Sequence, residues 1–589
     1  IASLGLLIFA PALTLGLQFD DLNHRVALRP IEGLEEVARS PLELFAFVDG
    51  DPGRARMAMD RGLSPWFMDE HLRLSFFRPL SGLTHGLDFG LWPEHHWLMH
   101  LHSLLWYVAL VLVAALCFRR FLAPAWVAGL ATLLYAIDDA HQFPAVWLAN
   151  RNAVIGGFFG ILALVAHDRW RRQGSRPAAA LAPVALLAAL LANEGAVAIG
   201  GYLLAYALFI DTGARVQRWR SLLPGALVGV AWAAAYGLLG HGASGSGLYV
   251  DPVGEPLRFV GAVVERAPLL VWGQWAFPAA DLHGVLSEPA GRVMWLGALG
   301  LLVVLAVLLA PLVRRDRTAR FWALGAVLAL LPACGTFAAN RLLIFVGLGS
   351  MGLLAQYLAW LRAPEAWRRL RHRIVFAALI VVHVVLAPLG VVGGFQQIGS
   401  LARLDQQMAD TLPADEALRA QRLVIVSSPS ALSSMYAFLI HAITERSLPE
   451  RALILAPTVH ALEVRRVDAR TLAVRPRGGL LLPAGRAPDG DEAAQPVFDV
   501  RYAFQQLDQV FRGPERPFVQ GEAIALTGVT IEITELGAHG RPTEIRFRFA
   551  DPLESPSLRW VTWTEGGYVP FALPAIGSTV TLAAPAVTL

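Results

Sequence analysis

Two adjacent aspartates stand directly after the first apolar stretch of the chain. In "LGLQFDDLNHR", Asp20 and Asp21 follow an apolar run that ends at Leu17. Carboxylates at the edge of a hydrophobic segment are costly and usually functional. Neighbouring side chains point apart on a helix or strand, so we expect one reactive group and one capping or orienting group. The alternative is that Asp20 merely caps an interfacial helix while Asp21 is solvated.

The composition indicates a membrane protein. Of 589 residues, 55% are hydrophobic and only 16% are charged, whereas soluble domains carry about 25% charged residues. All 49 basic residues are Arg, which excludes a Walker A lysine and therefore the usual P-loop. The two cysteines, Cys117 and Cys334, lie far apart and predict neither a disulfide framework nor a thiolate metal site.

The apolar segments predict a polytopic α-helical membrane protein, because a helical span needs about 20 apolar residues. We count eleven candidate spans: 1–17, 97–118, 122–137, 152–167, 178–192, 196–210, 222–239, 292–313, 320–333, 341–360 and 374–394.

Arginine clusters in the short loops predict the orientation of these spans. Each cluster, such as "DRWRRQGSR" or "RRDRTAR", follows an even-numbered span, and Arg-rich short loops are cytoplasmic. Three long segments are then extracytoplasmic: 18–96, 240–291 and everything after about 395. The apolar stretch 177–210 has clusters at both ends, which predicts two passes that turn at Asn193 and Glu194.

Further polar residues emerge at the same membrane face as the two aspartates. They are contributed by separate outer turns: Asp138, Asp139, His141, Glu194, Asn340 and Arg341. Their convergence on one side of the bilayer predicts a single functional site there.

The chain divides by composition into a transmembrane domain, 1–395, and a soluble extracytoplasmic domain, 396–589. Segment 18–96 is the first outer loop of the transmembrane domain, with interfacial helices. In the soluble domain, "QRLVIVSS" and "RALILAP" predict buried strands and "SALSSMYAFLIHAIT" a helix, and later runs such as "TEIRFRFA" alternate like strands. We expect an α/β start, a β-rich end and a loop at 483–496. Without a catalytic motif, its expected role is accessory or acceptor-positioning.

The order of these motifs resembles the GT-C superfamily of polyprenyl-phosphate-sugar glycosyltransferases. "FDDLNHR", then "FFRPLSGLTHGLDFGLWPEHHWLMHLHSLLWYVAL", then "LLYAIDDAHQFPAVWLANRNAVIGGFFGILAL" are similar to the protein O-mannosyltransferase branch and, within it, to TMTC-type mannosyltransferases of family 39. Arg78 stands in the Arg-Pro-Leu motif, His102 in the His-rich second span, and Glu194 in "LANEGAVAIG". Asp138, Asp139 and His141 stand roughly where the family has its motif after the third span, but the Pro and Glu of that motif are absent. The tetratricopeptide repeats of the TMTC-type enzymes do not follow in this sequence.

The resemblance implies an inverting transfer of a mannose-like sugar from a polyprenyl-phosphate donor. It implies Asp20 as the general base, with Asp21 as the reserve. The leaving phosphate needs a positive partner, and Arg can hold phosphate oxygens in a bidentate fork. Arg341 is the first candidate and Arg151 the second.

The remaining polar residues are candidates for an acceptor or metal region: Asp138, Asp139, His141, Glu194, Arg78 and His102. Carboxylate oxygens suit a divalent cation such as Mg²⁺ or Mn²⁺, so a metal is left open. The histidine spacing does not match the H-E-x-x-H zinc pattern.

Two other classes of function remain open. A transporter or lipid flippase predicts internal repeats and discontinuous helices that meet at the bilayer midplane. A scaffold for cell-envelope assembly predicts that the soluble domain is the working part. The expected partners of the glycosyltransferase are membrane lipids, the lipid-linked donor and an acceptor protein, lipid or glycan, with no nucleic acid. The expected location is a bacterial inner membrane, with the site on the periplasmic side.

Overall fold

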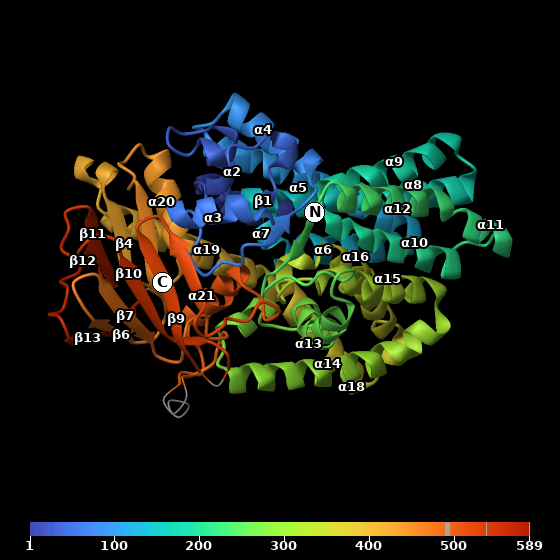
Figure 1. The fold of residues 1–589 in the computed structure, drawn as a ribbon. Coiled ribbons are helices and arrows are strands. Elements are labelled where there is room, and N and C mark those ends of the chain that lie inside the picture. The colour runs from blue at the N-terminus through green and yellow to red at the C-terminus, as the bar shows by residue number, and fades with distance from the viewer. Residues whose placement is uncertain (489–494, 538, 588–589) are drawn as a thin grey trace.

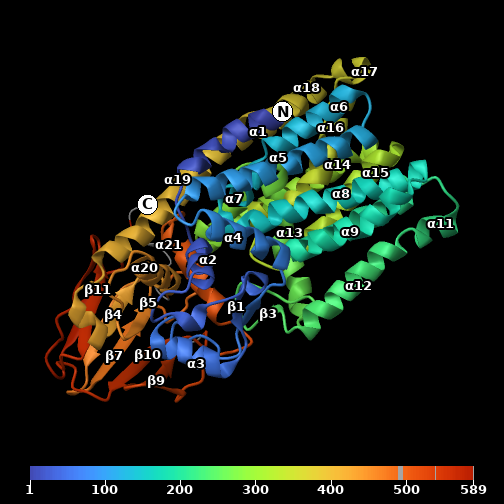
Figure 2. The ribbon, with the colours of Figure 1, turned by 90° about the horizontal axis from the view of Figure 1, so that it is seen from above.

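The computed structural model describes residues 1–488, 495–537 and 539–587. A bundle of helices carries, at one of its ends, a β-rich domain formed by the C-terminal part of the chain (Figure 1). Most helices of the bundle run roughly along a common direction (Figure 2).

Within the described residues, six helical segments are long and apolar enough to span a membrane. They are His96–Phe121 (α5), Leu148–Gln173 (the 3-10 helix η5, Leu148–Asn150, and α8, Arg151–Gln173), Arg215–Leu238 (α11, Arg215–Arg220, and α12, Leu223–Leu238), Glu288–Arg315 (α14), Ile344–Leu361 (α16) and Leu370–Thr411 (α18, Leu370–Ile380, and α19, Ala387–Thr411). The protein is therefore an integral membrane protein.

The other five predicted spans are also helical, but they are shorter. They are Ala2–Thr14 (α1, Ala2–Phe9, and η1, Ala10–Thr14), α6 (Ala125–Ala136), α9 (Arg176–Ala192), Glu194–Phe209 (η6, Glu194–Val197, and α10, Ala198–Phe209) and α15 (Arg317–Ala333). The predicted break in 177–210 is confirmed, because α9 ends at Ala192 and η6 begins at Glu194.

Helix α13 (Pro256–Trp275) was not predicted as an element of the 240–291 segment. Arg258, Glu265 and Arg266 interrupt its hydrophobicity, and Pro268 lies inside it. All but one of its buried residues lie between Pro268 and Trp275, so the packing of that end against the bundle stabilises the helix more than its own sequence does.

The first outer segment forms α2 (Asp20–Leu28), β1 (Ala46–Asp49), α3 (Pro52–Arg61), β2 (Arg73–Ser75) and α4 (Pro79–Leu91). Strands β1, β2 and β3 (Gly242–Ser244) make a small antiparallel sheet. Part of this segment shares a hydrophobic core with the C-terminal domain. The indole of Trp66 donates to the carbonyl of Leu455 (3.1 Å) and packs edge-on against Phe547 (5.7 Å).

The C-terminal domain contains two sheets and confirms the expected strands. The first has the order β12-β11-β4-β5, in which β4 (Arg422–Ser428), β5 (Arg451–Pro457) and β11 (Leu558–Thr564) are parallel and β12 (Gly567–Pro570) is antiparallel. The second, β13-β6-β7-β10-β9-β8, is antiparallel. Its strands are β6 (Leu462–Arg466), β7 (Thr471–Pro476), β8 (Ala523–Leu526), β9 (Val529–Leu536), β10 (Pro542–Phe549) and β13 (Thr579–Leu582). Residues 489–494 of the expected 483–496 loop lie outside the described residues.

Two helices connect this domain to the bundle. Helix α19 runs out of the bundle to the domain and lies beside α20 (Ala431–Ile443) (Figure 2). Helix α20 also packs against α2, so a face of the C-terminal domain meets the two aspartates that follow the first span.

Candidate functional site

The two aspartates begin helix α2 and have different surroundings. Phe19 precedes them with a φ of +51°, which turns the chain sharply into the helix. Asp21 is 2% exposed, and its carboxylate accepts N–H bonds from Gln18 (3.1 Å) and Ala149 (2.7 Å). Burial raises the pKa of Asp21 to about 8. Asp21 therefore ties the start of α2 to the segment before α8.

Asp20 is half-buried and accepts a hydrogen bond through one of its two carboxylate oxygens. Its Oδ1 accepts the hydroxyl proton of Tyr436 (2.8 Å) from the C-terminal domain, whereas Oδ2 accepts no hydrogen bond from the residues described. Burial raises the pKa of Asp20, and Tyr436, Arg341 and Arg78 oppose that rise by favouring the charged form. A carboxylate with a raised pKa is a better general base near neutral pH than an exposed one.

Arg341, the first candidate for the phosphate partner, has its guanidinium packed on aromatic rings. It lies in the 3-10 helix η8 (Asn340–Leu342), and its guanidinium is held over the rings of Trp147 (5.6 Å) and Phe337 (5.3 Å). Its side chain makes no hydrogen bond or ion pair within the ranges that the structure describes. Phe19 packs edge-on against Trp147 (5.7 Å), so Asp20 and Arg341 flank one aromatic contact.

Asp138 and Asp139 join a buried polar cluster beside η8. Asp138 accepts a hydrogen bond from Gln274 of α13 (2.8 Å), and Asp139, in the 3-10 helix η4 (Asp139–His141), accepts one from Asn340 (3.1 Å). Burial raises the pKa of Asp138 to about 6, and burial together with Asp138 raises that of Asp139 well above its usual range. The cluster orients the turn that carries Arg341.

Asp281 completes this cluster from the 3-10 helix η7 (Ala280–Val285). The backbone N–H of Asn340 donates to its carboxylate (2.8 Å), and the side-chain oxygen of Asn340 accepts from Ala280 (2.9 Å). Among the described residues, no group of three or more His, Cys, Asp and Glu side chains is arranged to hold a metal ion.

Arg78 and Glu194 form an ion pair with each other. Arg78 Nε donates to Glu194 Oε2 (2.8 Å), and Nη2 pairs with Oε1. The guanidinium also lies over Phe45 and Phe76 (5.1 and 4.6 Å). The pair links the start of α4 to the turn between α9 and α10. Glu194 is bonded to Arg78, whereas Asp138 and Asp139 are bonded to Gln274 and Asn340.

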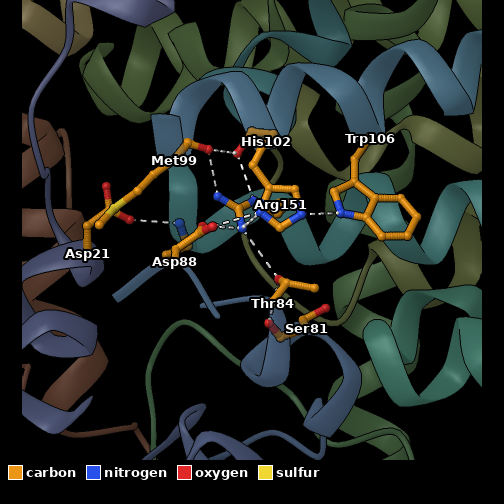
Figure 3. A network of polar contacts seen from close by, with 10 residues as sticks. Asp21, Ser81, Thr84, Asp88, Met99, His102, Trp106 and Arg151 are labelled. Carbon is orange, nitrogen blue, oxygen red and sulfur yellow. Dashed lines mark hydrogen bonds and ion pairs between the residues drawn. The ribbon is translucent and has the colours of Figure 1, made fainter. Parts of the chain in front are cut away.

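Arg151 lies in a closed polar network, shown in Figure 3. It is 0% exposed, and its Nη1 is 2.5 Å from Oδ2 of Asp88. It also donates to the hydroxyl of Ser103 and the carbonyl of Met99 (both 2.8 Å). His102 belongs to the same network, with its Nδ1 2.7 Å from Asp88 Oδ1. The network joins α4, α5 and α8 and leaves Arg151 no free face for a phosphate.

His141 is likewise enclosed. It is 1% exposed, and its ring packs against those of Tyr135 (4.4 Å) and Tyr107 (5.9 Å). Its surroundings are those of a core histidine behind the aspartate turn.

An apolar cavity of about 410 Å³ lies between α13, α14, α15 and α16. Its walls include Trp275, Leu305, Val327 and Leu353, and Arg314 lines it as well. Trp275 follows Gln274 directly in the chain, so one part of the cavity adjoins the acidic cluster.

Comparisons with known proteins give only distant likenesses. No protein-family model and no curated protein matches the chain. It is similar to the solved structure of ArnT from Cupriavidus metallidurans bound to undecaprenyl phosphate, with 16% identity and a TM-score of 0.35 over 75% of this chain and 88% of that one. It is also similar to the oligosaccharyltransferase AglB from Archaeoglobus fulgidus in complex with an inhibitory peptide and a dolichol-phosphate. That likeness has 14% identity and a TM-score of 0.36, over 76% of this chain and 64% of that one.

Tyr436, Gln274 and Asp281 also belong to this region, and they were not predicted from the sequence. No local signal marks Tyr436 or Asp281, because each lies in a segment far along the chain from its partner; Tyr436 is 416 residues from Asp20. Gln274 is the polar residue of an apolar helix end, which is the one local feature that could have singled it out.

We expect Arg151→Met to lower the stability of the fold and not the affinity for a phosphate-bearing substrate. Removing one partner of a buried ion pair costs about 3–5 kcal/mol because the other charge is left uncompensated. The thermal unfolding midpoint of the purified protein should therefore fall, and the double variant Asp88→Leu/Arg151→Met should recover part of the loss. If the variant instead has unchanged stability and a raised KM for a polyprenyl-phosphate sugar, Arg151 binds the phosphate.

Proposed function

We propose that this protein is a glycosyltransferase that moves a sugar from a polyprenyl-phosphate donor to an acceptor at the extracytoplasmic face of the membrane. The observation that carries the proposal is that Asp20 and Arg341 both adjoin the Phe19–Trp147 contact. Among the described residues, Oδ2 of Asp20 accepts no hydrogen bond, and the guanidinium of Arg341 makes no hydrogen bond or ion pair. The resemblance of the motifs around Asp20, Arg78 and Glu194 to the GT-C superfamily supports it.

The two groups suit the two ends of an inverting displacement. The acceptor oxygen attacks the anomeric carbon as its proton passes to Asp20, and the bond from that carbon to the phosphate oxygen breaks. Polyprenyl phosphate leaves with the bonding electrons, and the guanidinium of Arg341 meets the charge. The apolar cavity between α13 and α16 has the character that a polyprenyl chain requires.

The donated sugar is mannose-like by the family resemblance. The membrane is a bacterial inner membrane, and the arginine clusters favour a periplasmic site. The chain forms a transmembrane domain, 1–395, and a soluble domain, 396–589.

The test uses purified protein in lipid with a panel of labelled polyprenyl-phosphate sugars. Release of polyprenyl phosphate, by hydrolysis or by transfer, is scored for the wild type and for Asp20→Asn. Turnover of one donor that disappears in the variant supports the proposal and names the sugar. Movement of intact lipid between leaflets without cleavage would instead support a flippase.

A further inference from the structure

The C-terminal domain contributes a side chain to the candidate site. Tyr436 lies on α20, is 6% exposed, and donates its hydroxyl proton to Oδ1 of Asp20 (2.8 Å). Its ring also lies 6.4 Å from that of Phe19, the residue that turns the chain into α2. The domain therefore contacts the site through a specific hydrogen bond as well as through packing.

The helix that carries Tyr436 is fixed at its N-terminus. The carboxylate of Asp508, from α21 (Arg501–Asp508), accepts hydrogen bonds from the hydroxyl of Ser430 (2.8 Å) and from the backbone N–H of Ala431 (2.9 Å). A carboxylate that satisfies the free N–H groups of a first turn stabilises the helix and holds its start in place. Tyr436 stands in the second turn from that anchor.

Tyr436 acts only as a donor in this position. Burial and the neighbouring carboxylates of Asp20, Asp405 and Asp21 raise the pKa of its phenol well above the usual value, so the proton stays on the oxygen across the physiological range. A donor to a carboxylate favours the charged form of that carboxylate. It also fixes which oxygen remains available.

We propose that Tyr436 is a positioning residue for Asp20: it occupies Oδ1 and holds the carboxylate so that Oδ2 receives the proton of the acceptor hydroxyl. This inference rests on the proposed function. The site is then incomplete without the C-terminal domain, which is more than an accessory or acceptor-positioning module.

The groups that face Asp20 come from four elements. Tyr436 is on α20, Arg341 on η8, Arg78 directly precedes α4, and Asp21 follows Asp20 on α2. Of these, the two arginines and Tyr436 lower the pKa of Asp20. Removing the phenol hydroxyl should therefore raise the pKa of Asp20. On acidification, activity that needs the charged carboxylate should then begin to fall at a higher pH than in the wild type.

The experiment compares Tyr436→Phe with Tyr568→Phe in the full-length protein. Tyr568 is a matched control, because it is buried in the same domain and its hydroxyl bonds to Ser428 (3.1 Å) and Ser434 (3.0 Å) away from Asp20. In Tyr436→Phe we expect kcat to fall roughly tenfold, as for loss of a hydrogen bond to a charged group. We expect the acid limb of the rate profile to move up by roughly one pH unit and the KM for the donor to stay unchanged. Tyr568→Phe should match the wild type in all three.

The outcomes separate this inference from the function on which it rests. If Asp20→Asn abolishes turnover while Tyr436→Phe keeps the wild-type kcat and acid limb, the positioning role is overturned and the function stands. Full turnover in Asp20→Asn overturns both. An equal fall in Tyr436→Phe and Tyr568→Phe, with lowered unfolding midpoints and no movement of the acid limb, shows a structural role only and also overturns the inference.

Discussion

Asp20→Asn should lower the turnover of the lipid-linked donor by about 10²–10⁴-fold, the usual contribution of a positioned general base. The amide keeps the size of the side chain and can still accept the bond from Tyr436 at Oδ1, but it cannot take a proton from the acceptor. The unfolding midpoint should therefore stay close to the wild type. The measurement is the initial rate of polyprenyl phosphate release by purified protein in lipid.

Asp21→Asn is the informative companion because it tests the reserve candidate. Asp21 is 2% exposed, and its two oxygens accept backbone N–H bonds from Gln18 and Ala149. An amide can replace only one of these acceptors, so we expect a lowered unfolding midpoint and a smaller loss of rate per folded molecule than in Asp20→Asn. The reverse order of the two rate losses would make Asp21 the base.

Arg341→Ala should lower turnover by about 10²–10³-fold, the range measured when one preorganised donor to a developing charge is removed. Two effects act together, because the variant loses the partner of the leaving phosphate and one of the charges that lower the pKa of Asp20. The acid limb of the rate profile should therefore move to higher pH as well. Arg341→Lys should recover part of the rate, since a Lys keeps the charge without the bidentate fork.

Arg362→Ala is the matched control for Arg341→Ala. Arg362 follows α16 where Arg341 precedes it, and its guanidinium likewise lies over two aromatic rings, Trp367 (4.7 Å) and Phe376 (5.8 Å). Both variants lose similar cation–π packing, but only one is near Asp20. Equal losses of rate in the two would show that Arg341 acts through packing, and would remove it from the phosphate site.

Much of the fold follows from local patterns. The apolar runs and the arginine clusters locate eleven helical segments, because a helix in a bilayer must satisfy its backbone internally and expose an apolar surface whatever its neighbours are. The alternation of apolar and polar residues likewise locates strands such as β10. Helix α13 escaped because its charges break the apolar run, and packing of its C-terminal end stabilises it.

The sequence by itself determined the acidic pair after the first span, the helical membrane part, the β-rich end and the single face at which the polar turns meet. Only the tertiary structure decided which of those polar groups remain available. It buried Arg151 against Asp88 and bonded His102 to the same carboxylate, and it paired Arg78 with Glu194. It left the guanidinium of Arg341 without a hydrogen-bond partner among the described residues and brought Tyr436 to Asp20. The physical reason is that the pattern of apolar and polar residues reflects the surroundings of each segment by itself. The pairing of charges depends instead on which side chains come within a few ångströms when the segments pack together. Those segments can be hundreds of residues apart, as Asp20 and Tyr436 are.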